Sequence, residues 1–325
     1  MGRQDLTYAV ARIRALETKM FTEEDLNRLL ACPTEDDAVE MLMAKGWGNG
    51  EDAKDGETIL EHELDKTWET VRSLVEDMST LDVLSYKDLH HNIKSAMKQV
   101  ASGVDAPETY IDNSFYSADE LLEIIREKAW HRFPDFLQKP AADAYDMLIK
   151  TGDGQMLDVM MDRTCLESIY EAGKRSDSEI IKKYACETVG VTDIKIAIRC
   201  QRTGKSADFM ETALARRPGT GVDVDKLIKA ALSGEGAVIE YVEETDYHDG
   251  AQALKNSMSE FECWCDNRII DLIKPELRNS DGIGPIFAYI YARENELKSV
   301  RNILMGKRSG LPTEEIRERV RKTYV

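Results

Sequence analysis

The sequence predicts an all-α protein, and three observations lead to that prediction. Helix breakers are scarce, with 20 glycines and 8 prolines among 325 residues. Apolar residues recur every three or four positions in nearly every segment, which is the period of a helix with one buried face. No stretch alternates apolar and polar residues for long enough to predict a strand.

Capping residues and periodicity place the first helices. Residues 5–19 repeat their apolar positions at helical spacing. Thr22, followed three residues later by Asp25, opens a capping box for a helix that runs through Leu30. The first two helices are therefore expected over 5–19 and from Thr22 through Leu30.

The next helix starts after a proline. Pro33 stops the preceding helix, Thr34 caps a new one, and the glycine-rich run 46–50 ends it. A long helix is expected over 58–78, with its apolar residues on one stripe. The same periodicity predicts further helices over 86–100, 118–130, 141–151, 155–173, 177–188, 192–203, 207–215, 224–232, 237–243, 251–273, 285–305 and 312–323.

Chain length and turn-rich breaks predict more than one module. A chain of 325 residues exceeds what one core usually serves. Breaks at 46–56, 102–117, 216–221 and 279–284 separate groups of helices. None is long or low in complexity, so flexible linkers are not expected.

Internal similarity predicts a repeat. The segment "NIKSAMKQVASG" (92–103) aligns with "DIKIAIRCQRTG" (193–204), and "SVRNILMGKRSG" (299–310) aligns less tightly. A second pairing joins 26–47 with 227–247, and "ADELLEIIREKAW" (118–130) is a degenerate candidate for a third copy. We expect three similar helical lobes, over about 1–85, 86–187 and 188–325. The alternative is an irregular helical protein with recurring amphipathic patterns.

Charge and hydropathy exclude several classes of function. The formal net charge is −18, which disfavours nucleic acid as a partner because phosphate binding needs a cationic face. No apolar segment follows a basic start, so no signal peptide is expected. The longest nearly uncharged apolar run, 283–292, is far shorter than the roughly 20 residues that span a bilayer.

The sequence predicts no catalytic residue, no metal ion and no cofactor. Six cysteines are scattered, and the one close pair, Cys263 and Cys265, lacks the second pair that a zinc site needs. The adjacent His90 and His91 point about 100° apart on a helix and cannot share one metal face. Gly204-Lys205-Ser206 lacks the earlier glycine and the strand of a phosphate-binding loop, so Lys205 is interpreted as a solvated loop residue.

The helix over 285–305 carries charges inside an apolar pattern. Glu294 stands four residues before Lys298, which is the favourable order for an ion pair on a helix. Glu296 and Arg301 lie nearer the apolar side. They are expected either to be satisfied in the core or to contact another subunit.

Three stretches resemble one family. The stretch "GPIFAYIYARENELKSVRNILMGKRSGLPTEEIRERV" resembles the C-terminal signature of the C subunit of prokaryotic V-type (A-type) ATPases, the counterpart of the eukaryotic d subunit. The stretches "YAVARIRALETKMFTEEDLNRLLACPTEDDAVEMLMAKGWG" and "VTDIKIAIRCQRTGKSADF" resemble its opening and its middle motif. The likeness runs in order from Tyr8 to Val320. Asp193 stands where the middle motif usually has Asn, while Asn92 fits the earlier copy.

The resemblance implies a fold and a role. It implies a funnel of three lobes at the cytoplasmic side of a membrane, held there through a complex. The protein would grip the rotor stalk subunits (D and F type), rest on the membrane rotor ring, and transmit torque for ATP-coupled H⁺ or Na⁺ transport. It would bind no nucleotide and no small-molecule substrate. The choice of ion would belong to the ring.

Interface or bracing roles are expected for Tyr289, Glu296 and Arg301, with Asn92 and Asp193 as repeat-equivalent polar positions. Two other classes of function remain open. One is a free-standing helical-repeat scaffold that binds a protein partner. The other is an all-α enzyme, which would need a buried titratable cluster that the sequence does not reveal.

Overall fold

A computed structural model of the chain describes residues 6–48, 55–111 and 115–325. Within these ranges every regular element is helical and none is a strand, so the all-α prediction is confirmed. The predicted breaks at 46–56 and 102–117 lie partly outside the described residues.

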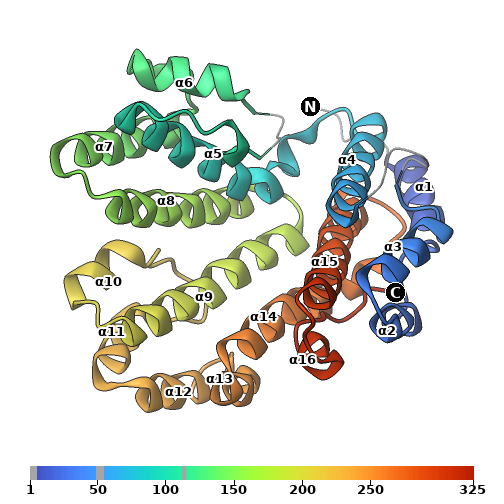
Figure 1. Cartoon of the computed structure of the whole chain (residues 1–325). Helices are drawn as coiled ribbons and strands as arrows, with labels where there is room; N and C mark the ends of the chain where they lie inside the picture. Colours follow the sequence, from blue (N-terminus) through green and yellow to red (C-terminus); the bar gives the residue numbers. More distant parts are fainter. Residues whose placement is uncertain (1–5, 49–54, 112–114) are drawn as a thin grey trace. The chain divides into compact units, whose positions relative to one another are not determined.

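The described helices follow one another with short connections (Figure 1). The α-helices are α1 (Thr7–Glu17), α2 (Glu23–Ala31), α3 (Glu35–Ala44), α4 (Gly56–Leu74), α5 (Asp82–Ser102), α6 (Ala118–Arg126), α7 (Asp135–Thr151), α8 (Gly154–Arg175), α9 (Glu179–Arg202), α10 (Ala207–Ala213), α11 (Val224–Ser233), α12 (Glu235–Glu243), α13 (Ala251–Asn256), α14 (Met258–Ile273), α15 (Ile283–Arg308) and α16 (Thr313–Arg317). Short 3₁₀ turns cover Met78–Thr80, Pro107–Thr109, Trp130–Arg132, His248–Gly250 and Lys274–Arg278.

Both predicted capping residues are confirmed. Thr22 accepts a hydrogen bond from the backbone N–H of Asp25, whose side chain accepts one in return from the Thr22 N–H. Thr34 makes the same reciprocal pair with Asp37 at the start of α3. Each box satisfies backbone donors that the first turn of a helix leaves unpaired.

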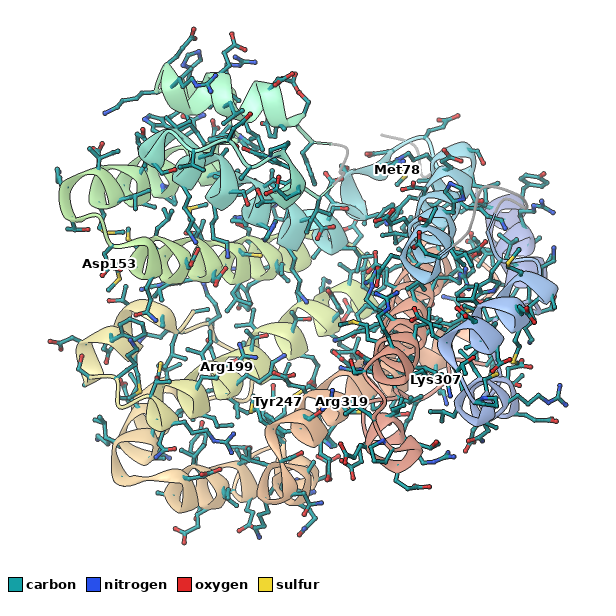
Figure 2. The ribbon with its side chains drawn as sticks, in the orientation of Figure 1. Met78, Asp153, Arg199, Tyr247, Lys307 and Arg319 are labelled. Carbon is teal, nitrogen blue, oxygen red and sulfur yellow. The ribbon has the colours of Figure 1, made fainter. Side chains whose placement is uncertain are left out.

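The predicted helices 177–188 and 192–203 are wrong as separate elements, because α9 runs without a break. The expected interruption centred on Gly190, which lies inside the helix. A Cβ atom at Gly190 would sit 2.0 Å from the Tyr247 hydroxyl oxygen and 2.6 Å from the Thr220 carbonyl oxygen. The glycine therefore serves close packing rather than a turn; Tyr247 is labelled in Figure 2.

Two predicted helices near the C-terminus also differ from the structure. The span 251–273 is divided at Ser257, which is extended and accepts a hydrogen bond from the N–H of Glu260 to begin α14. The last helix ends at Arg317 instead of 323. The residues beyond it form a turn and an irregular segment held by side chains of other helices; for example, the Arg321 N–H donates to the Ser299 hydroxyl at 3.1 Å.

The first of two compact units contains residues 1–78, 178–184 and 248–325. Its central element is α15, which packs against α1, α2, α3, α4 and α16. In Figure 1, α15 lies alongside α4. The core between them is apolar and comprises Phe21, Leu26, Leu29, Leu30, Ala38, Leu42, Trp47, Ile59, Leu60, Leu297, Val300, Ile303, Leu304 and Ile316.

The second unit contains residues 79–177 and 185–247. Here α5, α7 and α8 pack side by side, and α11 packs on α12 (Figure 1). Lys94 and Lys98 of α5 pair with Asp162 and Asp158 of α8, at 2.5 and 2.6 Å. These pairs require the two helices to run antiparallel. The boundaries of three lobes, at 1–85, 86–187 and 188–325, stay a prediction.

Candidate functional site

A buried ion-pair network joins α4 to α15. The Arg293 guanidinium donates to Glu63 of α4 at 2.8 Å and to Glu296 one turn along α15. It also lies over the ring of Trp47, 5.0 Å from the ring centroid, a cation–π contact. We call Glu63, Arg293 and Glu296 the α4–α15 brace. One cation between two carboxylates links the two helices, since separating them would break the buried Arg293–Glu63 pair and leave Glu63 with only Lys66 of its own helix.

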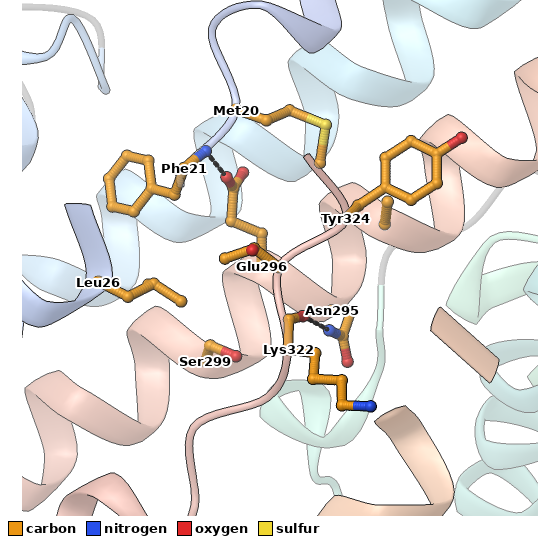
Figure 3. A pocket seen from close by; sticks show the side chains of 10 residues that line it. Met20, Phe21, Leu26, Asn295, Glu296, Ser299, Lys322 and Tyr324 are labelled. Atoms are coloured by element: carbon orange, nitrogen blue, oxygen red, sulfur yellow. Dashed lines mark hydrogen bonds between the residues drawn. The ribbon is translucent and has the colours of Figure 1, made fainter. Parts of the chain in front are cut away.

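Glu296 also fixes the chain entering α2. Its second oxygen accepts a hydrogen bond from the Phe21 N–H (Figure 3). Burial raises the pKa of Glu296, and Arg293 and the Phe21 N–H oppose that rise. Of the two expectations for Glu296, satisfaction in the core is what the structure shows.

The carboxylate of Glu296 borders a small pocket that holds no reactive arrangement. Its lining comes from the α1–α2 connection, α15 and the segment after α16 (Figure 3). Asn295 in this lining donates to the Lys322 carbonyl at 3.4 Å. Each Glu296 oxygen accepts a hydrogen bond from within the chain, one from the Phe21 N–H and one from Arg293.

Tyr289 lies deep in the same unit. It is buried, and burial raises the pKa of its hydroxyl. The nearby charges that act on it are Arg293, Glu296, Glu63 and Glu17. Within this chain Tyr289 packs inside the unit that α15 organises.

Arg301 supplies a second, outer link between α15 and α4. Its Nε donates to Glu57 in the first turn of α4 at 3.1 Å. Both side chains are partly exposed, at 43% and 42%. A pair this exposed contributes little stability by itself. Its effect is to orient α15 relative to α4.

Sequence reasoning missed the end of α15. Lys307 (Figure 2) donates to the carbonyl oxygens of Leu30 and Cys32 after α2, the first at 2.9 Å. Arg308 forms a two-point pair with Glu35 of α3, at 2.8 and 2.5 Å. The available signal was the basic pair in the last turn of the helix, where cations also favour the helix dipole.

Asn92 forms a clasp, by which we mean a helix side chain bonded to the backbone of a segment that returns beside it about 20 residues later. Asn92 of α5 is buried. Its Oδ1 accepts from the Ile111 N–H at 2.8 Å, and its Nδ2 donates to the Ile111 carbonyl at 2.6 Å. The amide thereby satisfies both backbone groups of one residue.

Asp193 makes the corresponding clasp on α9. Its Oδ1 accepts from the Ala215 N–H at 2.9 Å. The side chain is completely buried, and its Oδ2 has no hydrogen-bond partner. As expected from the Asp in place of Asn, the donated bond that Asn92 makes is missing.

A third clasp lies at Ser299 of α15, which the repeat aligns with Asn92 and Asp193. Its hydroxyl accepts from the Arg321 N–H at 3.1 Å. The separations along the chain are 19, 22 and 22 residues. Sequence reasoning did not single out Ser299, and the signal that could have found it was the repeat itself.

Other sequence-marked residues have ordinary structural roles. Lys205 lies in the loop after α9, is partly exposed, and donates to Gln155 at 2.8 Å in an exposed hydrogen bond. Ser206 caps α10 by accepting from the Phe209 N–H. Among the described residues no three His, Cys, Asp or Glu side chains are grouped to hold a metal ion. No helix in the described ranges is both long and apolar enough to cross a membrane.

Comparison with known proteins identifies the family. Residues 9–319 match the model of the ATP synthase (C/AC39) subunit family. The chain belongs to this family. The resemblance seen in the sequence is thereby confirmed.

Relatives of the ATP synthase (C/AC39) subunit family match this chain along nearly its whole length. The C subunit of the V-type sodium ATPase of Enterococcus hirae is 22% identical, over 96% of this chain and 97% of its own. The C subunit of the A-type ATP synthase of Methanocaldococcus jannaschii is 25% identical, over 95% of this chain and 84% of its own. That of Methanothermobacter thermautotrophicus is 24% identical, over 96% and 86%.

Proposed function

We propose that the chain is the non-catalytic central-stalk subunit of a V/A-type rotary ATPase. It links the rotor shaft to the membrane ring of ion-carrying subunits and transmits torque for ATP-coupled H⁺ or Na⁺ transport. The observation that carries this proposal is the family match over residues 9–319. The name of the Enterococcus hirae relative specifies sodium, but the ion carried is a property of the ring.

The proposed partners are the D- and F-type stalk subunits and the rotor ring of the same complex. The chain would act at the cytoplasmic face, as a peripheral subunit held through these partners. The lack of a membrane-spanning helix in the described ranges is compatible with that position. Contacts of Tyr289, Glu296, Arg301, Asn92 or Asp193 with a partner remain a proposal, and bracing within the chain is the role that their surroundings favour.

Stiffness is the property that such a coupling protein needs, and the first unit is built for it. Its signature helix α15 is tied to α4 by the α4–α15 brace and by Arg301. Lys307 and Arg308 tie the end of α15 to the α2–α3 region. Links in the middle and at the C-terminal end of one helix resist its rotation against its neighbours, and this supports a mechanical role.

Three matched helical segments support the proposed threefold repeat. Each carries a clasp residue, and each ends at a glycine with positive φ, at 69°, 63° and 65° for Gly103, Gly204 and Gly310. The positions one, four and five residues after the clasp residue are buried in all three copies. These are Ile93, Ala96 and Met97; Ile194, Ala197 and Ile198; and Val300, Ile303 and Leu304. We propose that they are the equivalent helices of three lobes arranged as a funnel.

The proposal is tested on the assembled complex. Removing this chain should leave ATP hydrolysis by the complex but abolish ATP-driven ion transport, and adding the purified chain back should restore transport. Co-purification of the chain with stalk and ring subunits separates this role from that of a free-standing scaffold. Undiminished ion transport without the chain, or hydrolysis of ATP by the chain alone, would overturn the proposal.

A further inference from the structure

The second carboxylate oxygen of Asp193 has no explanation in the proposed torque role. It is buried and lacks a hydrogen-bond partner, while the first oxygen accepts from Ala215. A buried polar atom without a partner is uncommon in folded proteins and is destabilising. The loss is larger when the group carries a charge.

Asn92 shows what the same position does with a donor. Its amide bonds both the N–H and the carbonyl of Ile111. An ionised aspartate has acceptors only, so Asp193 cannot make the second of these bonds while it is charged. A protonated carboxyl group has one O–H donor and can.

We propose that Asp193 is a proton-operated clasp. Its Oδ2 takes up one proton from water and donates it in a hydrogen bond to the Ala215 carbonyl, as Asn92 Nδ2 does to the Ile111 carbonyl. The protonated clasp holds the segment after α10 by two bonds, and the ionised clasp holds it by one. Acidification therefore tightens the attachment of this segment to α9.

The charged groups around Asp193 decide where the clasp titrates. Arg163 of α8 and Arg216 of the returning segment favour the ionised carboxylate, as does the Ala215 N–H. The Arg216 N–H acts in the same direction without forming a hydrogen bond to Oδ2. Burial acts against them and is the larger effect, so the pKa of Asp193 is raised to about 6. On α12, the hydroxyl of Tyr241 bonds the backbone of Asp223 and also feels the charge of Asp193; burial together with this charge raises the pKa of Tyr241.

Neither cation is free to form a tight pair with Asp193. Arg163 is engaged with Glu167 at 3.1 Å. Arg216 is engaged with Glu211 and Asp225, at 2.5 and 2.8 Å. Because these carboxylates compete for the two cations, burial remains the main influence on the pKa of Asp193.

The sign of the effect follows from linkage. The pKa of Asp193 is higher in the folded chain than the ordinary value of 3.8. The extra stability is fully present below about pH 4 and is lost as the pH rises through about 6. Between about pH 8 and about pH 5, the equilibrium constant for local opening should fall about tenfold.

Hydrogen exchange on the full-length chain tests the proposal. In wild type, the exchange rate of amides in 213–217, corrected for the intrinsic effect of pH, should fall about tenfold between about pH 8 and about pH 5. Asp193→Asn should show protection that no longer varies with pH. The matched variant Asn92→Asp should gain a pH dependence at Ile111. An unchanged pH profile in Asp193→Asn would overturn the proposal.

A second measurement avoids reliance on a variant that folds. In wild-type chain with ¹³C-labelled aspartate carboxyl groups, one buried carboxyl should titrate near pH 6, because burial raises the pKa of Asp193 to about 6. Titration of every aspartate below about pH 4.5, within the ordinary range, would equally overturn the proposal. These readouts are local or residue-resolved, so they do not depend on the partners or on the role in the ATPase.

Discussion

Arg293 of α15 and Glu63 of α4 form an ion pair of 2.8 Å in which both side chains are almost completely buried, at 7% and 6% exposure. The two residues are 230 positions apart in the chain. Glu296 shares the same guanidinium, so one cation serves two buried carboxylates. Removing that cation is the most direct way to test the brace.

Arg293→Met should destabilise the chain by about 3–5 kcal/mol, because it leaves the buried Glu296 without a cation and leaves Glu63 with only the largely exposed Lys66. Urea unfolding of wild type and variant measures the change. Arg301→Met is the matched control, since it removes a partly exposed pair between the same two helices. The free energy of unfolding of the control should fall by no more than about 1 kcal/mol. Equal losses in the two variants would contradict a dominant role for burial.

Gly190→Ala should destabilise the second unit by more than about 2 kcal/mol, because the added methyl group would meet Tyr247 and the Thr220 carbonyl. Gly236→Ala provides the control on α12, where nothing lies within 4 Å of the new Cβ atom. There alanine should be neutral or stabilising by up to about 1 kcal/mol. Thermal unfolding of both variants decides the point, and a tolerated alanine at position 190 would refute close packing as the reason for the glycine.

His90 should make stability fall on acidification. It is buried, its Nδ1 lies 2.8 Å from the Tyr86 carbonyl oxygen, and burial lowers its pKa from 6.5 to about 4. The neutral ring is favoured in the folded chain, so its contribution is present above about pH 6.5 and is lost as the pH falls towards about 4. The total change in the free energy of unfolding from this group is about 3 kcal/mol.

His90→Gln should flatten this part of the pH profile of unfolding, measured in urea. His91→Gln, one residue away and half-buried, is the control and should leave the slope in place. A wild-type slope that survives in His90→Gln would exclude His90 as its source. The effect is opposite in sign to that of Asp193, which is why the clasp is tested by local exchange.

Ser299→Ala should loosen the segment after α16. The hydroxyl accepts from the buried Arg321 N–H. Leaving a buried donor unpaired lowers stability by about 1–3 kcal/mol. Amide exchange at 319–323 should accelerate by at least tenfold, which is about 1.4 kcal/mol. Ser73→Ala, an exposed serine bonded to the Thr70 carbonyl, serves as control. Unaltered exchange at 319–323 would show that the other contacts of this segment suffice.

Local chemistry explains why much of the fold was predictable. Thr22 and Thr34 begin helices through bonds to residues three positions away, so their role is readable in four residues of sequence. The continuous α9 was missed because the role of Gly190 is to make room for Tyr247, which lies 57 positions further along the chain. The division at Ser257 follows from a local cap on Glu260 that the periodicity does not report. The early end of α16 depends on side chains of other helices, such as Ser299.

The candidate site divides in the same way. Asn92 and Asp193 were found because a repeat places them at matched positions, and the same alignment contained Ser299. Glu296 and Arg301 were found because a charge inside an apolar stripe needs a partner. Their partners in distant segments, the Phe21 N–H for Glu296 and Glu57 of α4 for Arg301, were not identified, since no local pattern links those segments to α15.

The sequence by itself determined that this protein is helical, where most helices start, and which family it belongs to, because these depend on spacings within a few turns or on motifs read in order. Only the tertiary structure decided which charges are buried together and which backbone groups each clasp holds. The physical reason is that a charge or an amide takes its free energy from the groups around it. Those groups come from segments that folding, rather than chain order, makes neighbours.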